Sequence, residues 1–245
     1  MSDEIESGPL PPSYREVIEE KESDVIPPSL LSVDGQSITT QASQDEPAAI
    51  AYQLNRGISS LSHATSEVTF ERLVVPQNDS DEKAVASASR RKRHIYNLKY
   101  IHRAPGGLEG VPSDSPHYYV EAVSSRTKLG SLGIKKSTLR KQWKAIPLDM
   151  SGKNSSYKLP QFIKSADAAF TLSIKDDQFI WTDAQGTTVA EEALGDGEQP
   201  APNLQVKVAM PRNYLDLLAA LWCCHVWQQS ADGQGQVQSR LDSGT

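Results

Sequence analysis

The chain has 245 residues, of which 38% are hydrophobic, and its formal net charge is -6. This length suits one medium-sized domain with tails, and the negative charge argues against a general nucleic-acid binder. The longest strongly apolar run, residues 217–224, is shorter than the ~20 residues of a membrane span. The start MSDEIESG lacks the basic and apolar regions of a secretory signal. We therefore expect a cytoplasmic protein.

The first segment, residues 1–46, is rich in Pro, Ser, Asp and Glu, and Tyr14 is its one aromatic residue. Residues 1–50 hold eleven acidic and two basic residues, a local balance of -9. A segment of this composition cannot bury enough apolar surface to offset the entropy of ordering. The pattern predicts a disordered acidic tail.

This tail contains a short motif that fits the PPxY ligand of WW domains, formed by Pro11, Pro12 and Tyr14. Consecutive prolines hold a polyproline II conformation in advance, and the aromatic groove of a WW domain accepts Pro and Tyr rings. The motif predicts a WW-domain protein, such as a ubiquitin ligase, as partner. The alternative is an inert proline-rich stretch.

From residue 50 onward the pattern changes to short alternating segments typical of β-strands. A polar internal loop is expected at residues 76–93, and a Pro- and Gly-rich loop at residues 104–117. The expected strands lie at residues 51–54, 67–75, 94–102, 118–123, 129–134, 143–148, 170–174, 178–182, 187–190 and 204–210. Many short strands at such spacing imply a sandwich or a barrel.

Basic residues gather between residues 90 and 144, where thirteen bases face three acids. The first group suits a nuclear import signal, a patch for anionic lipid, or a solvated loop: Arg90, Arg91, Lys92 and Arg93. The second group surrounds Trp143, which suits a membrane interface unless the Trp simply packs inward: Lys135, Lys136, Arg140, Lys141 and Lys144.

The last expected element is a helix over residues 213–229, with Asn213 as N-cap and Asp216 in an acidic first turn. Its centre is apolar on all sides, and a helix without a polar face is either buried all round or spans a membrane. Because this helix is too short to span, we expect it to run through the middle of the β-structure. Residues 230–245 are polar and are expected to be disordered.

The expected fold class is therefore mostly β (α+β): a closed antiparallel β-barrel around a central hydrophobic C-terminal helix, with disordered tails. This plan resembles the Tubby-like and LURP-one-related domains over residues 50–229. The resemblance is carried, in order, by the segments 95–98, 129–133, 179–182, 188–190 and 215–223. It implies binding of phosphoinositides through basic residues on the barrel, although no individual lysine can be matched to the family.

Signatures of enzymes and metal sites are absent from the sequence. His94 and His102 lie eight residues apart on one expected strand, roughly 26 Å when extended, which is too far to share a metal. Cys223 and Cys224 are adjacent within the apolar helix and are interpreted as core residues. We expect no catalytic residues, no metal and no cofactor.

The favoured function is a non-enzymatic peripheral binding adaptor. Its barrel would recognise anionic lipid, such as a phosphoinositide membrane surface, or a protein, and its PPxY arm would recruit the WW-domain partner. The alternative is a nuclear regulatory protein imported through Arg90–Arg93. A carrier that encloses a small ligand is disfavoured, because the helix would fill the space inside the barrel.

Overall fold

The computed structural model describes residues 24–43, 45–74, 91–102, 114–124, 127, 129–137, 141–152, 158–194 and 201–242. These residues form fifteen strands, one short 3-10 helix, η1 (Ile58–Ser60), and one long helix, α1 (Arg212–Asp242). The strands are β1 (Val25–Ile26), β2 (Ser29–Asp34), β3 (Ser37–Gln41), β4 (Ala49–Leu54), β5 (Glu67–Val74), β6 (Arg91–Tyr100), β7 (Tyr118–Ala122), β8 (Leu132–Lys136), β9 (Gln142–Asp149), β10 (Gln161–Phe162), β11 (Phe170–Lys175), β12 (Gln178–Asp183), β13 (Thr188–Leu194), β14 (Pro202–Val206) and β15 (Met210–Pro211).

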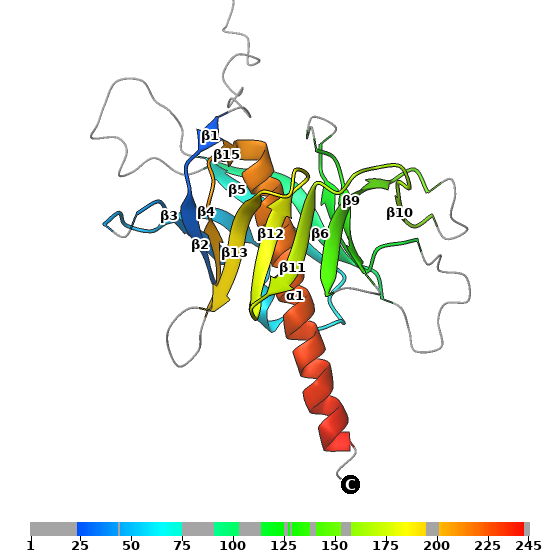
Figure 1. Cartoon of the computed structure of the whole chain (residues 1–245). Coiled ribbons are helices and arrows are strands. Elements are labelled where there is room, and N and C mark those ends of the chain that lie inside the picture. The colour runs from blue at the N-terminus through cyan, green and yellow to red at the C-terminus, as the bar shows by residue number, and fades with distance from the viewer. Residues whose placement is uncertain are drawn as a thin grey trace, which may run out of the picture.

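Twelve of these strands close into one antiparallel barrel (Figure 1). The ring runs β9-β11-β12-β13-β14-β2-β3-β4-β5-β6-β7-β8, and β8 pairs with β9 again to close it. Strand β10 pairs with the last residues of β9, and β1 pairs with β15 beside the ring. A barrel of this size leaves room for more than side chains alone. The predicted closed antiparallel barrel is confirmed.

Helix α1 fills the barrel, as predicted from its apolar composition (Figure 1). Every residue from Leu217 to Cys224 has no exposed surface, and Trp227 has none either. Burying a large apolar side chain contributes about 1.5–3 kcal/mol, so this segment dominates the core. Its neighbours are the inward side chains of the strands, among them Tyr52, Phe70 and Leu172.

The predicted N-terminal tail extends too far along the chain, because residues 25–41 form β1, β2 and β3. Leu31, Val33 and Ile38 alternate with exposed or partly exposed residues and point into the core. Between β2 and β3, Gly35 and Gln36 make the hairpin turn, and Gly35 adopts the left-handed backbone at φ +56 that favours glycine. The barrel therefore begins with β2 at Ser29 and not near residue 50.

The C-terminal boundary also differs from the expectation, since α1 begins at Arg212 and continues beyond Gln229 to Asp242. Part of this extension is held against η1 rather than free in solvent. The Ser230 hydroxyl donates to the carbonyl of Ser59 at 2.7 Å, and Ala231 is buried. The last turns project beyond the barrel (Figure 1).

Candidate functional site

The motif residues Pro11, Pro12 and Tyr14 lie outside the residues that the structure describes, as do Arg90 and Arg140. The remaining predicted binding residues lie on strands or directly beside them. They are Arg91, Lys92 and Arg93 on β6, Lys135 and Lys136 on β8, and Lys141 and Lys144 at or on β9. The site therefore has to be built from these two basic groups.

The first group begins β6, although these residues were expected in a loop. Lys92 forms an ion pair with Glu71 of β5 at 3.5 Å, and Arg93 lies directly opposite Arg72. Part of this cluster is therefore compensated by charge on the neighbouring strand. Solvent-exposed pairs of this kind contribute little to stability.

The two basic groups do not come together on the barrel. Leu132 of β8 is level with Leu98 of β6 through the shared neighbour Val120. The lysines of β8 follow Leu132 toward the end of β6, whereas Arg91 stands at its beginning. At ~3.3 Å per residue, the two groups are about 25 Å or more apart along the strands. They cannot hold one small ligand between them.

The second group lies where β8 ends and β9 begins, and we call it the lysine face: Lys135, Lys136, Lys141 and Lys144. Lys135 and Lys144 share one side of the sheet, and Lys136 lies on the other side, opposite Trp143. Lys135 and Lys144 are cross-strand partners, and like charges directly opposite one another are destabilising. In the described part of the chain, none of the four forms an ion pair. By contrast, the pairs Lys99–Glu121, Lys164–Asp114 and Lys207–Glu191 are all present. The lysine face is thus a concentration of uncompensated positive charge.

Aromatic rings lie under two of these lysines. The Lys135 Nζ is 5.2 Å from the centroid of Phe162, and the Lys136 Nζ is 5.7 Å from that of Trp143. Trp143 is not an exposed anchor, because its ring packs inward toward Phe179 and His225, with centroid separations of 6.1 and 5.7 Å. The inward-packing alternative for Trp143 is therefore correct.

Phe162 belongs to a strap, residues 158–166, that pairs with the end of β9 through the short strand β10. With Tyr119 and Leu148 it forms a small apolar cluster separate from the main core. Close approach requires Gly133, because a Cβ there would lie 2.7 Å from Pro116 and 2.9 Å from Phe162. Ile163, the residue after Phe162, is 39% exposed. Sequence reasoning missed the Phe162 ring beneath Lys135.

Inside the barrel, two carboxylates tie α1 to the wall. Asp216 on the helix accepts hydrogen bonds from the Tyr52 hydroxyl at 2.9 Å and from the Arg72 guanidinium. Burial, with Asp216 beside it, raises the pKa of the Tyr52 phenol well above its ordinary value. Asp216 is therefore a buried partner of the wall and not an exposed first-turn acid.

The second carboxylate, Glu192 of β13, accepts a hydrogen bond from the Trp181 indole at 2.7 Å. It also faces the Nδ1 of His225 on α1 at 2.9 Å. The Gln229 side-chain amide lies 3.3 Å from the Nε2 of the same ring. Both ring nitrogens thus have a partner, so this histidine is a satisfied core residue.

The cysteines also behave as core residues. Cys223 and Cys224 are free and fully buried, and burial raises the pKa of both thiols. Thiols of this kind are poor nucleophiles, since the thiolate is the reactive form. Across the described ranges, no group of three or more His, Cys, Asp or Glu residues is placed to hold a metal ion.

No protein-family model, no curated protein and no solved structure matches this chain. In the portion that the structure describes, no helix has the length and apolar character needed to cross a membrane. Any family relation of the barrel therefore has to be argued from its architecture and its surface.

Proposed function

We propose that this chain is a non-enzymatic peripheral adaptor whose barrel binds an anionic membrane surface through the lysine face. The observation that carries the proposal is the uncompensated cross-strand pair of Lys135 and Lys144, with Lys136 and Lys141 beside it. A fold that places like charges opposite one another gains free energy when an anion lies between them. A phosphoinositide headgroup supplies several such charges.

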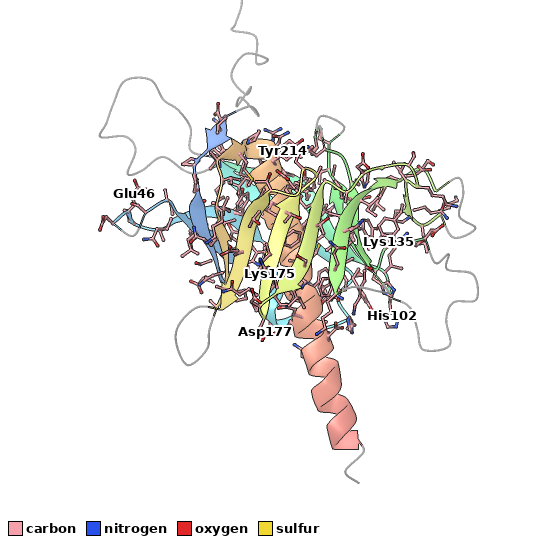
Figure 2. All side chains as sticks on the ribbon, in the orientation of Figure 1. Glu46, His102, Lys135, Lys175, Asp177 and Tyr214 are labelled. Carbon is pink, nitrogen blue, oxygen red and sulfur yellow. The ribbon has the colours of Figure 1, made fainter. Side chains whose placement is uncertain are left out.

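The neighbourhood of the lysine face also suits a membrane. Ile163, the residue after Phe162, offers exposed apolar surface, which would add apolar burial to the charge attraction. The strand order followed by a central C-terminal helix resembles Tubby-like and LURP-one-related barrels, which supports phosphoinositides as the lipid class. Figure 2 shows Lys135 on the side of the barrel that carries β9 and β10.

The lipid arm of the proposal is tested by co-sedimentation with phosphatidylcholine vesicles with and without phosphatidylinositol 4,5-bisphosphate. The double variant Lys135→Gln, Lys144→Gln should bind about 30-fold more weakly, because each lysine near an anionic surface contributes about 1 kcal/mol. A matched control, Arg56→Gln with Lys207→Gln, removes the same charge elsewhere and should leave binding unchanged. Equal loss in both variants would reduce the effect to net charge.

The salt dependence of vesicle binding provides a second test of the lysine face. Between about 0.1 M and 1 M salt the screening length falls from about 10 Å to about 3 Å. Binding through the lysine face should therefore collapse at the higher concentration. Binding that persists there and is lost in Ile163→Ser would mean that apolar insertion dominates.

The second arm of the adaptor is the PPxY motif, which would recruit a WW-domain protein of the ubiquitin-ligase type at the cytoplasmic side of the membrane. Consecutive prolines lower the cost of ordering the peptide on the partner. A pull-down with immobilised WW domains should retain the wild-type chain and lose Tyr14→Ala. Equal retention of both chains would overturn this arm and leave the barrel's proposal standing.

A further inference from the structure

A pocket of about 220 Å³ opens at the end of the barrel where α1 begins, remote from the lysine face. Strands β1 and β15 and the start of α1 lie at this end (Figure 1). Its walls come from β1 and β2, from the β3–β4 connection and from the first turn of the helix. Most of the lining is apolar and includes Ile26, Pro27, Leu31, Pro47, Ala51 and Leu215.

One polar side chain in this pocket lacks a partner. Ser29 lines the pocket, is only 3% exposed, and its hydroxyl makes no hydrogen bond. It begins β2 on the same inward-facing side as Leu31, so its hydroxyl belongs to the mouth of the barrel and not to the outer surface. Leaving a buried hydroxyl unpaired costs about 1–3 kcal/mol, and a ligand that accepts this hydrogen bond would recover that cost.

A positive charge stands at the same pocket. Arg212 is the first residue of α1, where helix N–H groups and the helix dipole favour anions. Its backbone amide is held by the carbonyl of Asp24 at 2.8 Å, and its side chain lines the pocket. The nearby carboxylate of Asp216 is already neutralised by Arg72. In the described residues Arg212 has no ion-pair partner, so its charge is open to a ligand.

Two further lining residues bear on the electric charge of the pocket. Tyr52 also lines the pocket, and burial, with Asp216 beside it, raises the pKa of its phenol, so this residue adds no negative charge. Glu46 is exposed (Figure 2). Among the described lining residues, Arg212 is the one cation and Glu46 is the one acid.

We propose that this pocket binds a short aliphatic monocarboxylate. The carboxylate would lie between the Arg212 guanidinium and the Ser29 hydroxyl, and the chain would lie against the apolar walls. A pocket of about 220 Å³ accepts only a short chain, and hexanoate is the ligand of this class that we select for the test. This site is independent of the lysine face and of the PPxY arm.

The test is a titration of the full chain with hexanoate, followed by amide chemical shifts in NMR spectra. Saturable shifts at residues 26–31 and 212–215, with a dissociation constant of about 1 mM or below, would support the site. Hexanol and hexylamine serve as uncharged and cationic probes of similar length. If either binds as tightly as hexanoate, carboxylate recognition is overturned.

Variants separate the two anchoring groups. Ser29→Val removes the hydroxyl without breaking any existing hydrogen bond, so the fold should survive while the dissociation constant rises about fivefold. Arg212→Gln should raise it at least about tenfold, and the matched control Lys207→Gln should leave it unchanged. Glu46→Gln should lower it slightly. Unchanged hexanoate binding in Ser29→Val and Arg212→Gln would overturn the proposal.

Discussion

The two ends of the buried helix are attached to the barrel in opposite senses. Near its start the helix supplies the acid, Asp216, and the wall supplies Arg72 and Tyr52. Further along, the wall supplies the acid, Glu192, and the helix supplies His225. In both places one carboxylate receives two donors inside an otherwise apolar core. A helix that is apolar on all faces has no preferred rotation, and we infer that these two pairs fix its rotation and depth.

The difference between the ends lies in the kind of base. The first attachment is a buried ion pair between the guanidinium of Arg72 and the carboxylate of Asp216. An imidazole can donate from Nδ1 while its Nε2 accepts from Gln229, so the second attachment needs no charge on the helix. The first end should therefore be the more sensitive to losing one partner.

The largest expected effect comes from Arg72→Ala, which leaves Asp216 buried without its cation. We expect the free energy of unfolding to fall by about 3–5 kcal/mol, measured by urea denaturation. The double variant Arg72→Met, Asp216→Leu removes both charges and should lose clearly less. A cost below about 1 kcal/mol for Arg72→Ala would contradict the distinction between the two attachments, because loss of the cation would then not leave Asp216 as an unpaired buried charge.

A smaller effect is expected at the other end from Glu192→Gln. The amide oxygen can still accept from Trp181 or from His225, so only the charge and one hydrogen bond are lost. The expected cost is about 2 kcal/mol in the same denaturation assay. If Glu192→Gln cost as much as Arg72→Ala, the two attachments would be equivalent and the distinction between them wrong.

The smallest effect at neutral pH is expected from Tyr52→Phe, at about 1.5 kcal/mol for one hydrogen bond to a charged group. This variant is most informative in alkaline solution. The folded-state pKa of Tyr52 is raised, so the unfolded chain loses this proton first, above about pH 10. The stability from this group is present below that pH and is lost as the pH rises.

Wild-type stability should therefore fall with pH above about 10, with about 1.4 kcal/mol per pH unit contributed by Tyr52. In Tyr52→Phe that contribution should disappear, so the gap between the two proteins should narrow as the pH rises. Urea denaturation at about pH 8, 10 and 11 measures this gap in the free energy of unfolding. A gap that stays constant would contradict the assignment.

The sequence predicts the centre of the molecule better than its edge. An apolar helix with no polar face has few places to lie, and the run from Leu217 to Trp227 was enough to place it inside the barrel. The strands β2 and β3 were missed because the average composition of residues 1–46 hid them. The turn residue Gly35, which lies between two alternating segments, was the local signal that could have found them.

Surface features were likewise predicted only where their residues lie close together in the sequence. The lysine face could be grouped from the sequence, because its members lie on two consecutive strands. Its separation from Arg91 could not, since that depends on strand register through β7. The Arg72–Asp216 pair joins residues 144 positions apart, and the pocket at Ser29 combines four segments. Neither the ion pair nor the pocket can be recognised from a pattern within one continuous segment of the sequence.

The closure of the barrel has a consequence for how the chain acquires its structure during synthesis. Strand β2 pairs with β14. One edge of this early strand therefore stays unpaired until β14 has been synthesised. The core is complete only when α1, which follows β14, has been made. Long-range pairing of this kind folds slowly and leaves strand edges open to other chains. A ribosome would thus carry nearly the whole chain before any of it could close.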